Sequence, residues 1–209
     1  MDRRLALLLP SLVLLLLTAV GWQLWPPPAR EARLPWPGLV AVGIATGALL
    51  LAGAWLMERA VPGFRRTSKR LERLVRDLRL PPGGALLAAL VSGVSEELFF
   101  RGWLLPTAGL WWQALAFMLL HPAGRSGLSY TAYTGVAGLV FGAVTLATGS
   151  LWPALIAHVG VNLHGFSLGG RRPRPSAAPR SGGAAHAGGP VSPGSRGSAR
   201  PPRGAPPAP

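Results

Sequence analysis

The chain has 209 residues, 49% of them hydrophobic, with 21 Lys and Arg against 7 Asp and Glu and no cysteine. This composition excludes an ordinary soluble domain, and the missing cysteine excludes disulfides, a thiol nucleophile and a thiolate metal site. The net charge of +14 flanks the apolar stretches and does not interleave with aromatic residues in the basic tail. We therefore attribute the charge to membrane topology and anionic lipid, and we expect no nucleic-acid partner.

Two apolar segments open the chain. Residues 5–25 are long enough to cross about 30 Å of hydrocarbon. This run is either a retained anchor or a cleaved signal peptide, and the tryptophans at its end favour the anchor. A turn rich in proline and arginine, 26–37, leads to a second span at 38–57. Residues 1–57 are thus predicted to form two N-terminal membrane spans.

A strongly basic segment follows at 58–82. Its apolar residues recur at helical spacing, which predicts an amphipathic helix lying on the inner membrane surface. We expect its charged face to contact solvent and lipid headgroups and to have no catalytic role. The apolar residues of this pattern are Leu71, Leu74, Val75 and Leu78.

The second half of the apolar region, 83–168, is predicted to be the catalytic membrane helix bundle. The fold class is therefore an all-α, polytopic membrane bundle of about six segments. With six crossings the positive-inside rule places both termini in the cytoplasm of a multi-pass cell-membrane protein. The Arg-, Pro- and Gly-rich tail, 169–209, is predicted to be disordered because it has too few apolar residues for a core. The four later segments are 83–105, 108–120, 128–148 and 151–168.

The segment 83–105 carries three charged residues that an apolar helix does not need. A charge at the centre of a spanning helix costs roughly 2.5 to 3.5 kcal/mol on insertion scales, so such residues indicate function. Glu97 and Arg101 have the i, i+4 spacing of an ion pair on one helix face. Glu96 points about 100° away and is free to act as a general base on water. A purely structural Glu–Arg lock would explain the pair but not Glu96.

Two further polar pairs share the i, i+4 spacing: Phe117 with His121, and His158 with Asn162. A lone histidine in a helix is usually structural or interfacial, but three such pairs together indicate a site. Counted from the predicted outer helix ends, Glu96 lies about 13 Å deep, His121 about 20 Å and His158 about 10 Å. One layer of the bundle could therefore hold all three side chains.

The remaining polar and small residues of these segments receive structural interpretations. His164 lies six residues beyond His158, on a different helix face, and is predicted to be interfacial. The small residues are predicted to form close-packing faces between helices. They are Ser92, Gly93, Ser95, Gly135, Gly138 and Gly142.

Three motifs in this order resemble those of the CAAX-protease and bacteriocin-processing (CPBP) family, the type II CAAX prenyl endopeptidase-like proteins. Residues 96–102 match EExxxR, residues 117–121 match FxxxH, and residues 158–162 match HxxxN. The resemblance covers about residues 83–168. It says nothing of the first two spans or the tail.

The resemblance implies an intramembrane endopeptidase with a hydrophilic cavity among membrane helices. Its substrate would be a membrane-associated protein or peptide, lipidated or membrane-anchored. Prenylated CAAX proteins, bacteriocin leaders, peptide pheromones and C-terminal sorting signals remain equally open. The implied catalytic residues are Glu96 and His121 to activate water, Glu97 and Arg101 to order the site, and His158 and Asn162 to stabilise the oxyanion.

The family has been argued both to use zinc and to be metal-independent. Glu96, His121 and His158 could supply the three ligands of a catalytic zinc with an open water position. We favour a metal-free glutamate-type enzyme without a cofactor, because the resemblance points that way and the sequence has no HExxH motif.

Three other classes of protein fit part of this pattern. A non-catalytic membrane immunity or partner protein could keep the fold and act by binding. A proton-coupled transporter also places acids and histidines in a membrane, but the chain lacks internal inverted repeats. A serine protease using Ser92 or Ser95 with His158 would leave both glutamates without a role.

Overall fold

The computed structural model describes residues 8–170, and the regular elements in this part of the chain are all helices, without strands. The predicted all-α membrane-type bundle is confirmed. The tail predicted to be disordered is 169–209, and nearly all of it, residues 171–209, lies outside the described residues.

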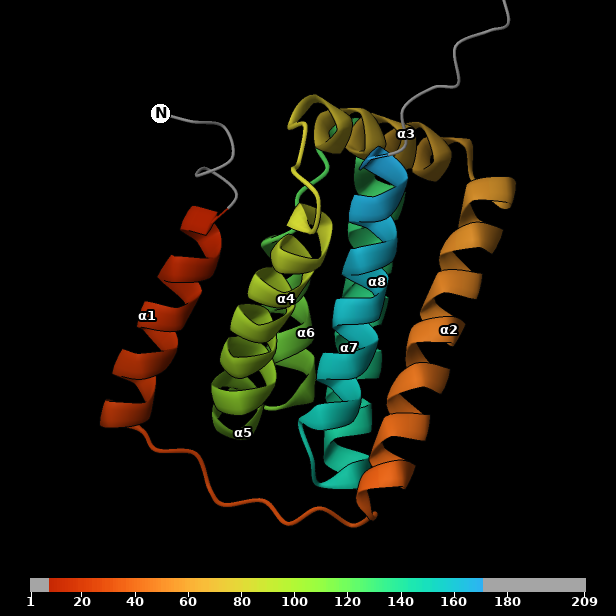
Figure 1. Cartoon of the computed structure of the whole chain (residues 1–209). Coiled ribbons are helices and arrows are strands. Elements are labelled where there is room, and N and C mark those ends of the chain that lie inside the picture. Colours follow the sequence, from red (N-terminus) through yellow and green to blue (C-terminus); the bar gives the residue numbers. More distant parts are fainter. Residues whose placement is uncertain (1–7, 171–209) are drawn as a thin grey trace, which may run out of the picture. The chain divides into compact units, whose positions relative to one another are not determined.

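Each predicted apolar segment contains a helix, and these helices run side by side (Figure 1). Two stretches, Trp36–Ala60 and Arg125–Thr148, are long and apolar enough to cross a membrane by length and composition. The other crossings stay a prediction. The helices of the six segments are α1 (Leu8–Leu24), α2 (Trp36–Ala60), α4 (Gly84–Glu97), α6 (Leu110–Leu119), α7 (Leu128–Thr148) and α8 (Trp152–Gly170).

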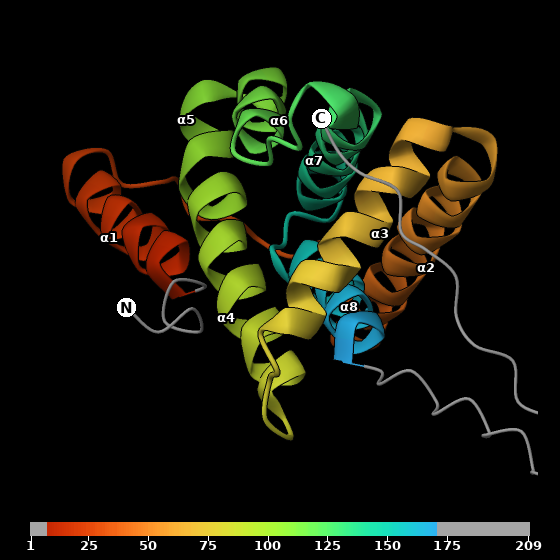
Figure 2. The ribbon, with the colours of Figure 1, turned by 90° about the horizontal axis from the view of Figure 1, so that it is seen from above.

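The basic segment forms α3 (Pro62–Asp77), which lies across one end of the neighbouring helices (Figures 1 and 2). It begins later than predicted, because α2 continues through Ala60 and Pro62 starts the new helix, where its missing N–H costs nothing. Phe64 is fully buried and packs against Tyr130 and Tyr133 of α7. The arginines of α3 are exposed. A helix is thus present in the predicted segment, with shorter bounds. Its place on the inner membrane surface, through Leu71, Leu74, Val75 and Leu78, stays a prediction.

The third segment is not one regular helix. After α4 the chain forms a wider π-helical stretch, η2 (Leu98–Leu104), and then α5 (Leu105–Ala108). The Leu105 N–H bonds the carbonyl of Phe100, five residues earlier. Pro106, which cannot donate to a preceding turn, follows directly and provides a reason for the irregular helix. The third segment, predicted to end at residue 105, therefore continues to Ala108. The next helix, α6, starts after Gly109, whose φ is 86°.

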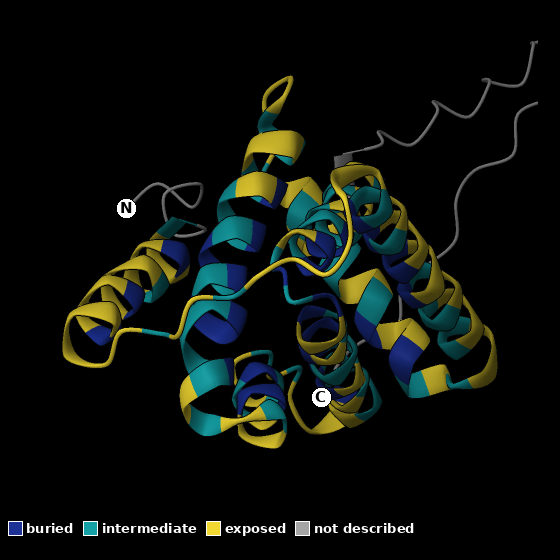
Figure 3. Ribbon diagram, turned by 90° about the horizontal axis from the view of Figure 1, so that it is seen from below, coloured by how far each residue is buried: buried dark blue, intermediate teal, exposed yellow. Residues whose placement is uncertain are grey.

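Exposed residues lie on the outer sides of the helices, while buried residues face the middle of the bundle (Figure 3). Many of the exposed residues are large and apolar. Ile44 and Leu49 on α2, Leu87 on α4 and Trp111 on α6 are each more than half exposed. A soluble protein rarely exposes apolar surface on this scale. The exposed surface therefore agrees with lipid as the surrounding solvent.

Small residues bring α6 and α7 close together. A Cβ atom added at Gly138 would lie 3.2 Å from a ring atom of Phe117 and 3.3 Å from the Ala114 Cα. At Gly142 it would lie 2.5 Å from the Gln113 amide nitrogen. The predicted close-packing role of these glycines is confirmed, and it keeps α6 near the rest of the site.

Replacement of Gly138 by Val should separate α6 from α7 and lower the free energy of unfolding by about 1 to 3 kcal/mol, as overpacking does elsewhere. Thermal unfolding of the purified protein in detergent measures the effect. Gly160→Val is the matched control, because an added Cβ there meets no atom within 4 Å. Equal melting temperatures for the two variants would contradict this account of the interface.

Candidate active site

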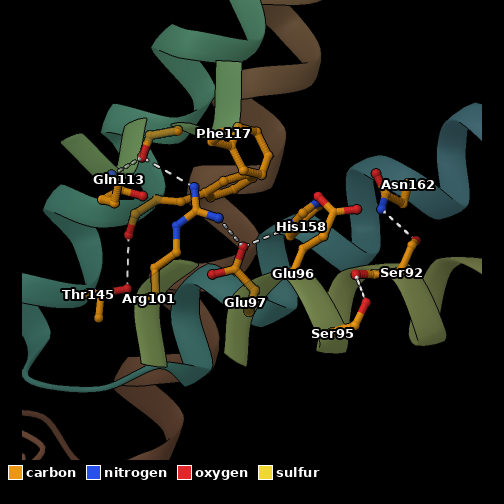
Figure 4. Close-up of polar contacts among 12 residues, drawn as sticks. Ser92, Ser95, Glu96, Glu97, Arg101, Gln113, Phe117, Thr145, His158 and Asn162 are labelled. Carbon is orange, nitrogen blue, oxygen red and sulfur yellow. Dashed lines mark hydrogen bonds and ion pairs between the residues drawn. The ribbon is translucent and has the colours of Figure 1, made fainter. Parts of the chain in front are cut away.

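A fully buried ion pair lies at the centre of the site. An Arg101 guanidinium nitrogen lies 2.8 Å from Glu97 Oε1, and both side chains are 0% exposed. The predicted Glu97–Arg101 pair is confirmed. Arg101 also donates to the Gly138 carbonyl at 3.2 Å and lies over the rings of Phe117 and Phe141 (Figure 4). The aromatic rings and the carboxylate together surround a cation that water cannot reach.

Glu97 also fixes the imidazole of His158. The distance from His158 Nδ1 to Glu97 Oε1 is 2.7 Å. The carboxylate paired with Arg101 accepts this hydrogen bond, so Nδ1 carries a proton, and Nε2 is the nitrogen left to accept when the ring is neutral. Phe141 stacks on the ring at a centroid distance of 5.0 Å. The orientation and the tautomer of His158 are therefore both set by its neighbours.

His121 is oriented in the same way by the backbone. Its Nδ1 lies 2.8 Å from the Phe117 carbonyl oxygen, which can only accept, so Nδ1 donates. Its Nε2 lies 3.5 Å from Glu96 Oε2, and His158 Nε2 lies 3.7 Å from the same oxygen. Two imidazole Nε2 atoms and one carboxylate oxygen thus converge, and this oxygen has no hydrogen bond to the described residues.

Exposure separates the two adjacent carboxylates. The side chain of Glu96 is 15% exposed and that of His121 32%, whereas Glu97 is completely buried. The two glutamates have different surroundings, as predicted, but they share His158, each facing a different ring nitrogen. Glu96 is therefore the more exposed of the two side chains and Glu97 the enclosed one, although the Oε2 atom of Glu96 is itself buried.

Asn162 lies one turn beyond His158 on α8 and points toward α4 (Figure 4). Its amide nitrogen donates to the Ser92 hydroxyl at 3.0 Å, and that hydroxyl donates to the Ala88 carbonyl at 2.8 Å. One N–H of the amide is held by this contact, and the second remains for another acceptor. The structure brings Asn162 beside the cluster without a direct contact to Glu96.

The serine alternative gains no support from these contacts. The hydroxyls of Ser92 and Ser95 donate to backbone carbonyls of their own helix, at 2.8 Å and 3.0 Å. Neither hydroxyl is hydrogen-bonded to His158. The predicted packing role of both serines agrees with these bonds.

Two residues of the site were not predicted from the sequence. Gln113 is fully buried and donates to the Gly138 carbonyl at 3.0 Å, the same oxygen that Arg101 contacts. Its spacing, four residues before Phe117 within an apolar segment, was a usable signal. Phe141, which stacks on His158, is one apolar residue among many and gave no signal.

Zinc was considered as a possible resident metal on Glu96, His121 and His158. Within residues 8–170, no group of three or more His, Asp or Glu side chains is arranged to hold a metal ion. The arrangement of these donors therefore gives the zinc alternative no support.

Fold and site together define a helical membrane-type protein with ionisable side chains enclosed among its helices. Residues 79–164 match the family model described as type II CAAX prenyl endopeptidase Rce1-like. This match confirms the resemblance predicted from the three motifs, and it supports a CAAX-type intramembrane protease in general. No curated protein and no solved structure matches the chain. The catalytic roles of the individual residues stay a prediction.

The two carboxylates should respond differently to neutralisation. Glu97→Gln leaves the buried Arg101 without its counter-charge and should lower the free energy of unfolding by about 3 to 5 kcal/mol. Glu96→Gln removes no close ion pair and should change it by less than about 1 kcal/mol. Thermal unfolding of both variants measures the difference. Equal destabilisation would show that the assignment of an enclosed and a more exposed carboxylate is wrong.

Proposed function

We propose that this protein is an intramembrane endopeptidase that hydrolyses a peptide bond of a membrane-associated protein or peptide. The observation that carries the proposal is the convergence of Glu96 Oε2 with the Nε2 atoms of His121 and His158, at 3.5 Å and 3.7 Å. All three atoms accept hydrogen bonds when the carboxylate is ionised and the rings are neutral. A water between them can donate to two of the three, and its oxygen is then directed for attack.

Glu96 is the general base of this mechanism. It takes a proton from the water as the water oxygen bonds to the substrate carbonyl carbon, which gives a tetrahedral oxyanion. Glu96 then returns the proton to the leaving amine nitrogen as the C–N bond breaks. His121 holds the water and, through Nε2, keeps it within reach of the carboxylate. The cycle ends with Glu96 ionised again.

Glu97 supports the oxyanion through His158. His158 Nδ1 donates to Glu97, so Nε2 can donate to an oxyanion only when the ring carries a second proton. The proton that Glu96 takes from the water supplies it across the 3.7 Å contact between Glu96 Oε2 and His158 Nε2, and it returns through Glu96 to the leaving amine. The adjacent carboxylate stabilises that charged ring, as in other His–carboxylate pairs. The second amide N–H of Asn162 is the other candidate donor. Arg101 keeps Glu97 in place through the 2.8 Å ion pair.

The proposed location is the cell membrane, with several crossings and both termini in the cytoplasm. The exposed apolar residues of the helices would contact acyl chains, and the arginines of α3 anionic headgroups. The substrate would reach the site in or at the membrane, because the site lies among these helices. Lipidated and membrane-anchored chains are therefore the first substrate classes to test.

Glu96→Gln should abolish cleavage, with a loss of about 10² to 10⁴-fold, because an amide cannot take the proton of water. The measurement compares protein termini by mass spectrometry in cells that express the wild type or the variant at equal levels. A terminus present only with the wild type identifies the substrate. Glu72→Gln, a carboxylate of α3 remote from the cluster, is the control and should cleave normally.

Other outcomes of that comparison distinguish the remaining classes of function. A phenotype that survives Glu96→Gln without any change in termini indicates a binding protein. Loss of cleavage in Ser92→Ala or Ser95→Ala, with retention in Glu96→Gln, would indicate a serine nucleophile.

Purified enzyme should keep its activity after treatment with 1,10-phenanthroline and dialysis, since the proposed base and donors all come from the chain. Cleavage of a fluorogenic peptide that spans the identified terminus gives the rate. Loss of at least 90% of the rate, with recovery on addition of Zn²⁺ alone, would replace the metal-free mechanism by a zinc mechanism.

A further inference from the structure

The π-helical stretch η2 leaves one backbone carbonyl without its regular partner. In this register a carbonyl bonds the N–H five residues later, as Phe100 does with Leu105. For Arg101 the residue at that position is Pro106, which has no N–H. A carbonyl away from water needs a donor, so this oxygen needs one from outside the helix.

The donor comes from the connection between α1 and α2, residues 25–35, which we name the strap. The Arg30 guanidinium donates to the Arg101 carbonyl at 2.9 Å, across 71 residues of sequence. Arg30 is half-buried, and burial lowers the pKa of its guanidinium. Arg101, whose side chain binds Glu97, is therefore itself fixed by the hydrogen bond from Arg30 to its backbone oxygen.

The strap is also attached to the far end of α7. The Arg33 N–H donates to the Thr148 carbonyl at 2.9 Å. Gly149, with a φ of 65°, follows α7 and lies directly against the Glu31 carbonyl oxygen, where no Cβ would fit. The exposed strap crosses the face seen in Figure 3. It therefore connects η2, which carries Arg101, with the end of the helix that carries Phe141.

We infer that Arg30 is a positioning residue of the active site: it supplies the hydrogen bond that Pro106 cannot, and so fixes the turn that presents Arg101 to Glu97 and, through Glu97, orients His158. Its effect on catalysis rests on the proposed function. Its effect on η2 does not.

Amide hydrogen–deuterium exchange of the full-length protein in lipid nanodiscs tests the contact without a substrate. Arg30→Ala should raise exchange in residues 98–105 about tenfold, the effect of one lost hydrogen bond to a buried carbonyl. Arg33→Ala is the matched control from the same strap. Its side chain donates to the Ala147 carbonyl at the end of α7 and not to η2, so exchange in 98–105 should stay unchanged.

Pro106→Ala provides the specific test, because it restores a backbone N–H to the turn. In that background Arg30→Ala should raise exchange in 98–105 by less than twofold, since the Arg101 carbonyl then has a donor in its own helix. A merely structural role of Arg30, through strap packing, predicts the same increase in both backgrounds. That result would overturn the inference.

Cleavage of the fluorogenic peptide separates this inference from the proposed function. Arg30→Ala should lower kcat about tenfold and leave KM unchanged. Unaltered kcat in an active protein with raised exchange would overturn the positioning role. If the wild type cleaves nothing but exchange changes as expected, the proposed function is contradicted. What then remains is the hydrogen bond by which Arg30 stabilises η2.

Discussion

The fully enclosed pair of Glu97 and Arg101 is the interaction on which the rest of the site depends. Removing two charges from water has a large desolvation cost, and their attraction offsets it only when geometry and further hydrogen bonds are favourable. Here the further bonds come from His158 and the Gly138 carbonyl. The pair thereby joins α4, η2, α7 and α8 in one arrangement. The ion pair therefore selects this one arrangement of the helices, and adds little to the free energy of unfolding beyond that.

Two neighbouring glutamates have opposite surroundings because of helix geometry alone. Residues one apart project about 100° apart, so Glu97 faces Arg101 in the interior and Glu96 faces the more accessible imidazole of His121. Glu97 is engaged by Arg101 and His158, whereas Glu96 Oε2 faces two imidazole nitrogens and has no hydrogen bond to the described residues. The division of labour in the proposed mechanism follows from this contrast.

Much of this site could be predicted from the sequence because charges are conspicuous in apolar helices. The ion pair of Glu97 and Arg101 was predicted from their i, i+4 spacing. The close packing at the glycines of α7 was predicted because small residues in membrane segments allow helices to approach. The π-helical turn could not, because it depends on which hydrogen bonds the folded chain selects around Pro106. Arg30 could not either: in the sequence it is one of many arginines, and its partner lies 71 residues away. Contacts between distant segments require coordinates.

The wide turn of η2 determines in which direction the side chains that follow it point. A regular helix would have the same length of apolar sequence and the same hydropathy, so composition alone does not record the extra residue in the turn. Deleting one residue between Arg101 and Pro106 would keep the segment equally apolar, yet it would remove the residue that the wide turn accommodates and change the hydrogen-bond register of the helix. Mutational tolerance here should therefore be far greater for exchanges of one apolar residue for another than for changes in length.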